Sequence, residues 1–170
     1  RTYYSNNTIP DKEFLTTSQR SAIQLLTSRN YLTTPVQQTM EKKDKRLYSV
    51  LRGYSSSLSS GMVVEDQYYC KGTDKYEKRI SYNKYDIYGN PVYINKDGAE
   101  KVVYLWGYKG QYLLAEIKGA TYEEVKKALM VDPASMSSCI LPSMPLYLDM
   151  IDNLYKALPS ALITSYTYHP

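Results

Sequence analysis

Residues 78–119, which read KRISYNKYDIYGNPVYINKDGAEKVVYLWGYKGQYLLAEIKG, decide the fold of this chain. Two tetrapeptides within them, from Asp86 to Gly89 and from Asn95 to Gly98, begin with a short polar side chain and end with glycine, which favours a type I turn. Lys109-Gly110 then predicts a two-residue hairpin loop with a positive φ at the glycine. We therefore expect four antiparallel strands joined by three tight turns. Such a meander is a scaffold and carries no chemistry of its own.

Before the meander, residues 1–76 predict a short helix and a first β unit. Residues 1–14 are polar and irregular. Helical spacing over residues 17–29 predicts a helix that Thr17 or Ser18 caps and Asn30 ends. Its expected core side consists of Ala22, Leu25, Leu26 and Arg29. Strands are expected over residues 35–41, 47–54 and 62–71, with a polar turn at 42–45 and a flexible serine-rich connector at 55–61.

After the meander of residues 77–119, residues 120–160 predict two helices with a Pro- and Ser-rich link over 131–143. The first helix begins at a capping box of Thr121 and Glu124, and the second spans residues 145–158 with Pro145 as its first residue. Its expected core side consists of Leu148, Ile151, Leu154, Tyr155 and Leu158. Residues 161–170 begin a further strand. The predicted fold class is mainly β with a few short helices (α+β).

The composition contains 20 Tyr but one Phe and one Trp. Tyrosine suits a sheet whose faces are partly solvated, because the ring packs while the hydroxyl reaches water. It also suits a face that stacks on sugars. Trp106, Tyr108 and Tyr112 form the best candidate for such a platform, since the first two project the same way and the hairpin folds Tyr112 back. Val102 and Tyr104 continue the same stripe, which favours core packing over a platform.

The charge pattern and the scarcity of reactive residues argue against several function classes. The net charge is +4, but basic and acidic residues alternate, whereas nucleic-acid binding needs a basic stripe on one face. Cys70 and Cys139 are too far apart in sequence for a CxxC metal or redox motif; they pair or stay as free thiols. No apolar run is long enough to span a bilayer. The chain begins at Arg1 without Met and reads as a piece of something longer.

Candidate catalytic residues are few, and each has a plainer interpretation. His169 is the sole histidine and stands next to the last residue, so nucleophilic catalysis or a zinc site lacks its usual groups. Paired carboxylates are the remaining route, as in glycosidases, and the candidates are Glu65, Asp66, Asp86, Asp97 and Glu100. Asp86 and Asp97 have turn-building roles, and Glu65 and Asp66 are expected to point to opposite faces of a strand. We therefore expect no enzymatic activity, no metal and no cofactor.

Two motifs in the meander resemble a known family. Tyr85-Asp86-x-x-Gly89-Asn90 resembles the YD repeat of the Rhs (rearrangement hot spot) family. The nonapeptide YLWGYKGQY over residues 104–112 is similar to a segment in exported Rhs-repeat proteins of Bacteroidetes-type bacteria. The residues of this nonapeptide are Tyr104, Leu105, Trp106, Gly107, Tyr108, Lys109, Gly110, Gln111 and Tyr112. The similarity continues through residues 115–129, and residues 158–170 resemble the start of another repeat.

This resemblance implies a role in a larger assembly. In the YD-repeat family, antiparallel strands coil into a hollow β shell that encloses a toxic C-terminal domain in some members, and related surface proteins are linked to carbohydrate binding. The core-associated region that cleaves itself at an aspartate has no counterpart here. The resemblance implies a secreted or cell-surface scaffold whose partners are neighbouring repeats of the same protein, a C-terminal cargo domain or a surface glycan. The alternative is a carbohydrate-binding surface module built on the aromatic face around Trp106.

Overall fold

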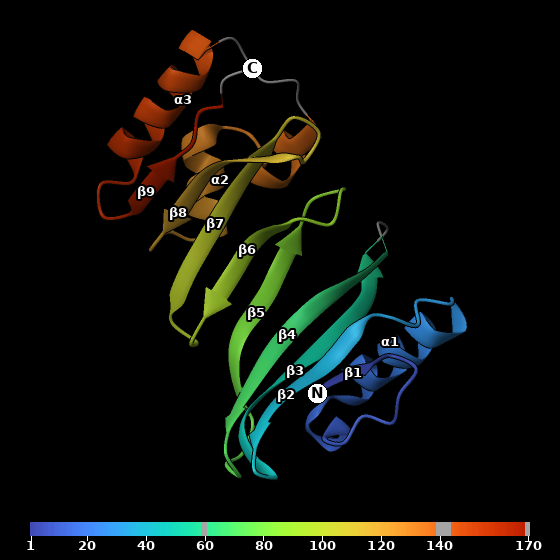
Figure 1. Cartoon of the computed structure of the whole chain (residues 1–170). Helices are drawn as coiled ribbons and strands as arrows, with labels where there is room; N and C mark the ends of the chain where they lie inside the picture. The colour runs from blue at the N-terminus through green and yellow to red at the C-terminus, as the bar shows by residue number, and fades with distance from the viewer. Residues whose placement is uncertain (59–60, 139–143, 169–170) are drawn as a thin grey trace. The chain divides into compact units, whose positions relative to one another are not determined.

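A computed structural model describes residues 1–58, 61–138 and 144–168 of the chain. The protein is mainly antiparallel β sheet with a few short helices, which confirms the predicted fold class (Figure 1). Its strands pair with their neighbours in the sequence, in chain order. The chain divides into two compact units, Arg1–Ser81 (unit 1) and Tyr82–Pro170 (unit 2).

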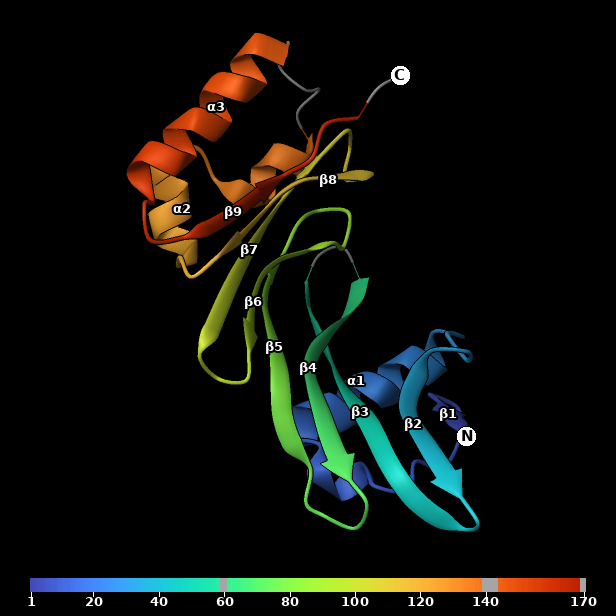
Figure 2. The same ribbon diagram turned by 60° about the vertical axis from the view of Figure 1, so that its left-hand side comes forward.

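Unit 1 is a sheet with one helix on its face. Helix α1 lies across β3 and β4 (Figure 2). The elements are β1 (Thr2–Tyr4), a 3₁₀ turn η1 (Lys12–Phe14), α1 (Thr17–Ser28), β2 (Pro35–Lys42), β3 (Lys45–Leu58), β4 (Gly61–Lys71) and the first part of β5 (Glu77–Tyr85). The core beneath α1 comprises Ile9, Leu15, Ala22, Ile23, Leu26, Val36, Leu51 and Tyr54.

Several predictions for unit 1 need correction. The helix cap is Thr16, whose Oγ1 accepts from the Gln19 N–H at 3.2 Å while Gln19 Oε1 accepts from the Thr16 N–H. Asn30 does end the helix, with a φ of 67°. The predicted connector at 55–61 is wrong for residues 55–58, which continue β3 with Ser55 and Leu58 paired to β4, and for Gly61, which begins β4; residues 59–60 lie outside the described residues. There the backbone ladder with β4 outweighs the weak strand propensity of serine.

The buried face of α1 is shifted from the predicted one. Gln19, Ala22, Ile23 and Leu26 are buried, whereas Leu25 is half-buried and Arg29 is exposed. The N-terminal 14 residues are also more regular than predicted, since they contain β1 and η1. The reason for the shift is Gln19, a polar side chain that an apolar-periodicity argument ignores but that the sheet accepts as a hydrogen-bond partner.

Unit 2 contains the predicted four-stranded meander and the predicted helices. Its elements are the remainder of β5, then β6 (Pro91–Lys96), β7 (Glu100–Gly107), β8 (Tyr112–Lys118), α2 (Tyr122–Leu129), a 3₁₀ helix η2 (Pro133–Ser138), α3 (Met144–Ala157) and β9 (Leu162–Ser165). Strand β9 pairs antiparallel with β8. The capping box of Thr121 and Glu124 is present as predicted. The link over 131–143 contains η2, which the Pro and Ser content did not indicate; residues 139–143 lie outside the described residues.

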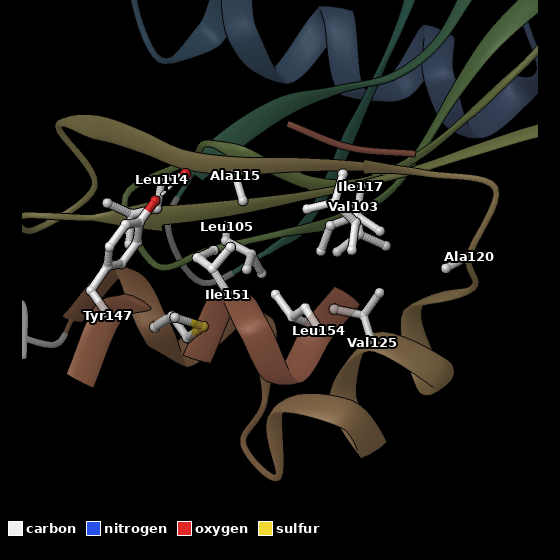
Figure 3. Packing of buried hydrophobic residues seen from close by; sticks show 12 residues of the cluster. Val103, Leu105, Leu114, Ala115, Ile117, Ala120, Val125, Tyr147, Ile151 and Leu154 are labelled. Atoms are coloured by element: carbon white, nitrogen blue, oxygen red, sulfur yellow. Dashed lines mark hydrogen bonds between the residues drawn. The ribbon is translucent and has the colours of Figure 1, made fainter. Parts of the chain in front are cut away.

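The core of unit 2 is apolar and lies between the sheet and the helices. Figure 3 shows Ile151 and Leu154 of α3 and Val125 of α2 directed toward Val103 and Leu105 of β7. The core side of α3 differs from the prediction, because Tyr147 is buried while Leu148 and Tyr155 are 52% and 48% exposed. The buried side of α3 consists of Tyr147, Ile151 and Leu154, and Leu158 packs against the same core just after the helix. The predicted face included Leu148 and Tyr155, which lie to one side of these residues.

Two turns of the meander differ in detail from the sequence prediction. At the β6–β7 hairpin, Asp97 and Gly98 have φ values of 47° and 74°, and the Ala99 N–H donates to the Lys96 carbonyl at 3.1 Å. This two-residue turn is one position later than predicted and matches the Asp-Gly preference of primed turns. The loop between β7 and β8 has four residues, Tyr108 to Gln111, instead of two. Tyr108, Lys109 and Gly110 are all left-handed there.

Candidate functional site

The YD turn, defined as residues 85–90, is built around one buried carboxylate. Asp86 is 3% exposed, and its Oδ1 accepts hydrogen bonds from the backbone N–H groups of Tyr88 at 2.9 Å and Asn90 at 2.8 Å. The Gly89 N–H donates to the Asp86 carbonyl at 3.2 Å, with a φ of 84° at the glycine. A buried carboxylate is costly unless donors replace its hydration. Asp86 is therefore committed to holding the turn.

Asn90 joins the YD turn to the loop between β7 and β8. Its Nδ2 donates to Asp86 Oδ2 at 3.1 Å and to the Gly110 carbonyl at 2.8 Å. Gly110 is required at this contact because its φ is 75° and because a Cβ there would lie 2.7 Å from Asn90 Nδ2. We call Asp86, Asn90 and Gly110 the turn–loop network. It brings together the two motifs that the sequence analysis singled out, which lie 20 residues apart.

Trp106 is anchored to the strand that follows the YD turn. Its indole Nε1–H donates to the Pro91 carbonyl at 2.8 Å, and its ring is half-buried. It is not a member of the apolar core of unit 2, which collects Val103 and Leu105 from the other face of β7. The indole is therefore a sheet-packing residue with a satisfied polar atom, and part of the ring remains open to solvent.

Tyr108 and Tyr112 meet at the loop and form the base of an exposed aromatic surface. Their ring centroids are 5.3 Å apart in an edge-on arrangement, and Tyr112 also contacts Tyr168 at 4.7 Å. The three rings are 38%, 44% and 36% exposed. We call them the tyrosine cluster. Sequence reasoning missed Tyr168, because its contact depends on residues after β9 returning past β8, where the Tyr168 hydroxyl donates to the Leu113 carbonyl at 2.9 Å.

The other motif residues lie around these contacts or at the far end of the strands. Tyr85 stacks on Tyr82 at 6.0 Å, and the Gln111 N–H donates to the Gly107 carbonyl at 3.0 Å. A Cβ on Gly107 would lie 2.7 Å from Leu114 Cδ1, so the glycine makes room for a core side chain. Burial raises the pKa of half-buried Tyr104 to about 12, with Glu116 adding to the effect. Asn95 and Gly98 belong to the β6–β7 hairpin and not to the turn–loop network.

Glu65 and Asp66 correct an expectation, because both carboxylates reach the same side of β4. Gln19 Nε2 donates to Glu65 Oε2 and to Asp66 Oδ2, each at 3.0 Å. The cause is a register shift opposite Gly53 and Tyr54, which pair with Asp66 and Val64 and leave Glu65 as the extra residue of a bulge. A bulge breaks strict alternation, so neighbouring side chains no longer point to opposite faces.

The surroundings of this acid pair are structural. Asp66 also accepts from the Tyr68 and Ser81 hydroxyls at 3.2 and 2.8 Å and faces the Lys78 ammonium at 3.5 Å. A Cβ on Gly53 would lie 2.3 Å from the carboxamide carbon of Gln19, so the glycine accommodates the amide that bridges the two acids. The hydroxyls, the Gln19 amide and the Lys78 ammonium together satisfy the carboxylate of Asp66, a residue that is 8% exposed.

The remaining sequence candidates are two carboxylates of one hairpin, a cysteine of unit 1 and two residues outside the described part of the chain. Asp97 occupies the β6–β7 hairpin, and Glu100 begins β7 opposite Lys96. Cys70 is buried and free, and its thiol donates to the Asp74 carbonyl at 2.8 Å. His169 and Cys139 lie outside the described residues. Across the described part of the chain, no three His, Cys, Asp or Glu side chains gather in a group that would hold a metal ion.

Comparison of the chain with family models, with curated proteins and with solved structures found no match. Among residues 1–58, 61–138 and 144–168, no helix combines the length and the apolar character that crossing a bilayer requires.

Proposed function

We propose that this chain is a non-enzymatic structural scaffold, a segment of a YD-repeat protein of the Rhs type that lies outside the cell or on its surface. Its strands would supply one layer of a larger β assembly such as a shell, with neighbouring repeats as partners. The turn–loop network is the observation that carries this proposal. The polar side chains of Asp86 and Asn90 are hydrogen-bonded within the turn and to the loop between β7 and β8, as expected of residues kept for architecture.

Strand addition at β9 is the mechanism that fits a scaffold. In chain order β9 follows β8, and among the described strands it has a partner on one side only. The Tyr166 N–H donates to the Leu114 carbonyl at 2.9 Å, so alternation directs the N–H groups of Ile163 and Ser165 away from β8. An outward row of such donors is a template for another strand.

Substitution of Ser165 tests this mechanism. Ser165→Pro removes an outward N–H while leaving the ladder with β8 intact, and Ser165→Ala is the matched control because it keeps that N–H. Sedimentation velocity over a range of protein concentrations measures self-association. We expect the wild type and Ser165→Ala to self-associate and Ser165→Pro to remain monomeric at the same concentration. A wild-type chain that is fully monomeric, or a Ser165→Pro variant that associates equally, would contradict strand addition at this edge.

A carbohydrate-binding surface module is the second candidate, and the exposed tyrosine cluster favours it. Aromatic rings at a surface stack on the apolar faces of sugars. The test is a glycan array with three variants, Tyr112→Ala, Tyr108→Ala and Trp106→Ala, each with its melting temperature. The module predicts a glycan hit that Tyr112→Ala abolishes without lowering the melting temperature. No hit, together with a lowered melting temperature for Trp106→Ala, supports the scaffold.

A further inference from the structure

A pocket on unit 1 lies between the N-terminal segment and α1. Its volume is about 760 Å³, within the range of small-molecule sites. Ile9, Leu15 and Ile23 line it with apolar side chains that belong to the core of the unit. Lys12, Arg20 and Gln24 contribute polar groups from the two sides. The pocket thus combines an apolar floor with a cationic rim.

Hydrogen bonds at both ends of the N-terminal segment hold the pocket open. At one end, the Thr27 hydroxyl of α1 donates to the Ser5 carbonyl at 2.9 Å. At the other end, Asp11 forms an ion pair with Arg46 at 3.0 Å and accepts a hydrogen bond from the Tyr76 hydroxyl at 2.9 Å. The wall is therefore fixed to both the helix and the sheet before any ligand arrives. Preorganisation of this kind lowers the entropic cost of binding.

The charged groups at the rim favour an anion. Lys12 is exposed and its ammonium forms no ion pair or hydrogen bond with the described residues, while the Arg20 guanidinium donates, within the same part of the chain, only to the neighbouring Thr17 hydroxyl at 3.2 Å. Glu13 also lines the pocket, so the balance of its charged side chains is one positive charge. Gln24 is exposed and adds an amide that has no hydrogen-bond partner among the described residues. Attraction between a cation and an anion is stronger beside an apolar wall than in open water.

We propose that this pocket binds a small amphipathic anion, a carboxylate or sulfonate attached to a compact apolar or aromatic body. The apolar body would lie against Ile9, Leu15 and Ile23, and the anionic group would face Lys12 and Arg20. This inference is independent of the scaffold role, because it concerns unit 1 and uses none of the motif residues.

The test uses two fluorescent probes on the full chain. The anion is 8-anilinonaphthalene-1-sulfonate, and N-phenyl-1-naphthylamine has the same aromatic body without the charge. We expect one saturable site for the sulfonate, with binding weakened about tenfold by Lys12→Glu, which corresponds to the loss of one ionic contact. Arg29→Glu is the matched control, since it makes the same charge change on the residue after α1 but does not line the pocket. It should change the affinity less than about twofold.

A second variant separates the pocket from general charge effects. Gln24→Trp fills the space from the α1 side without removing a cation, and it should abolish binding of both probes. Lys12→Glu should leave the neutral probe unaffected. Circular dichroism melting of each variant verifies folding. Equal weakening by Lys12→Glu and Arg29→Glu, or unchanged sulfonate binding by folded Gln24→Trp, would overturn the proposal.

Discussion

Unit 1 and unit 2 both consist of antiparallel strands with helices packed on them, but they differ in how many polar side chains they bury. In unit 1 the buried residues include Ser5, Gln19, Gln37, Thr39, Ser49 and Asp66, whereas in unit 2 the buried polar residues are Asp86 and Ser137, counted over the described residues. Gln37 illustrates the first kind, since the hydroxyls of Thr39, Ser49 and Tyr76 surround its amide nitrogen at 3.2–3.3 Å. An apolar core gains stability in proportion to buried area, while a polar core fixes one arrangement of partners.

The largest expected effect tests the apolar side of this comparison. Leu154 is fully buried in unit 2, so Leu154→Ala should lower the free energy of unfolding by about 3–4 kcal/mol through lost transfer energy and a cavity. Trp106, the sole tryptophan, reports denaturant unfolding of this unit by fluorescence. Leu148→Ala, on the same helix but 52% exposed, should change the free energy of unfolding by less than about 0.5 kcal/mol. Similar losses for the two variants would contradict the assigned core face of α3.

The next effect concerns the buried carboxylate of unit 2. Asp86→Ala leaves the N–H groups of Tyr88 and Asn90 without their acceptor and should cost about 2–3 kcal/mol. The same tryptophan-detected unfolding measures it. Asp152→Ala, at an exposed position of α3, is the control and should be close to neutral. A cost for Asp86→Ala no larger than that of the control would show that the turn does not need the carboxylate.

A smaller effect, and a sharper test of unit 1, is the fit of Gly53 to Gln19. Gly53→Ala should cost about 1–3 kcal/mol because the new methyl group collides with the Gln19 amide. In a Gln19→Ala background the same change should cost less than half as much, a coupling that a double-mutant cycle isolates. Hydrogen exchange of the Leu51 amide in β3 reports the stability of this unit. Additive costs would mean that the amide moves aside freely.

The smallest expected effect appears only at alkaline pH. Burial raises the pKa of Tyr54 to about 12, above the ordinary value of 10.0. The folded state favours the neutral phenol of Tyr54, whereas in the unfolded state the phenol ionises near pH 10. The stability that depends on the neutral phenol is therefore complete below pH 10 and is lost as the pH rises from 10 to 12. Absorbance titration of tyrosinate should therefore show a late component to which Tyr54 and Tyr104 both contribute, and Tyr54→Phe should reduce it by one tyrosine. An unchanged titration of the variant would mean that Tyr54 ionises with the exposed tyrosines.

Local patterns in the sequence predicted much of unit 2. The alternation of β7, the glycines at turns and the capping box at Thr121 each depend on residues a few positions apart, and all three correspond to observed elements. The length of the β7–β8 loop was not predictable in the same way. It is set partly by the bond from Asn90 to Gly110, a contact between residues distant in sequence.

Unit 1 was harder to predict because its polar residues take core positions. Gln19 and Gln37 are fully buried, yet a hydrophobicity pattern assigns both to solvent. The bulge that brings Glu65 and Asp66 to one side has no strong signal in the sequence; Gly53, opposite Asp66, is the closest to one. Tyr168 of the tyrosine cluster and the pocket beside α1 likewise depend on where distant segments return.

The central claim is that the YD motif has a structural role, in which it joins a turn to a loop distant in sequence. Hydrogen exchange of the Asn90→Ala variant tests this claim most directly. The variant keeps the Asn90 backbone N–H but removes the bond to the Gly110 carbonyl. We predict faster exchange of the Gln111 amide in the loop, by about tenfold, with a smaller change at Tyr88. Unchanged exchange at Gln111, with any effect confined to residues 86–90, would contradict the claim.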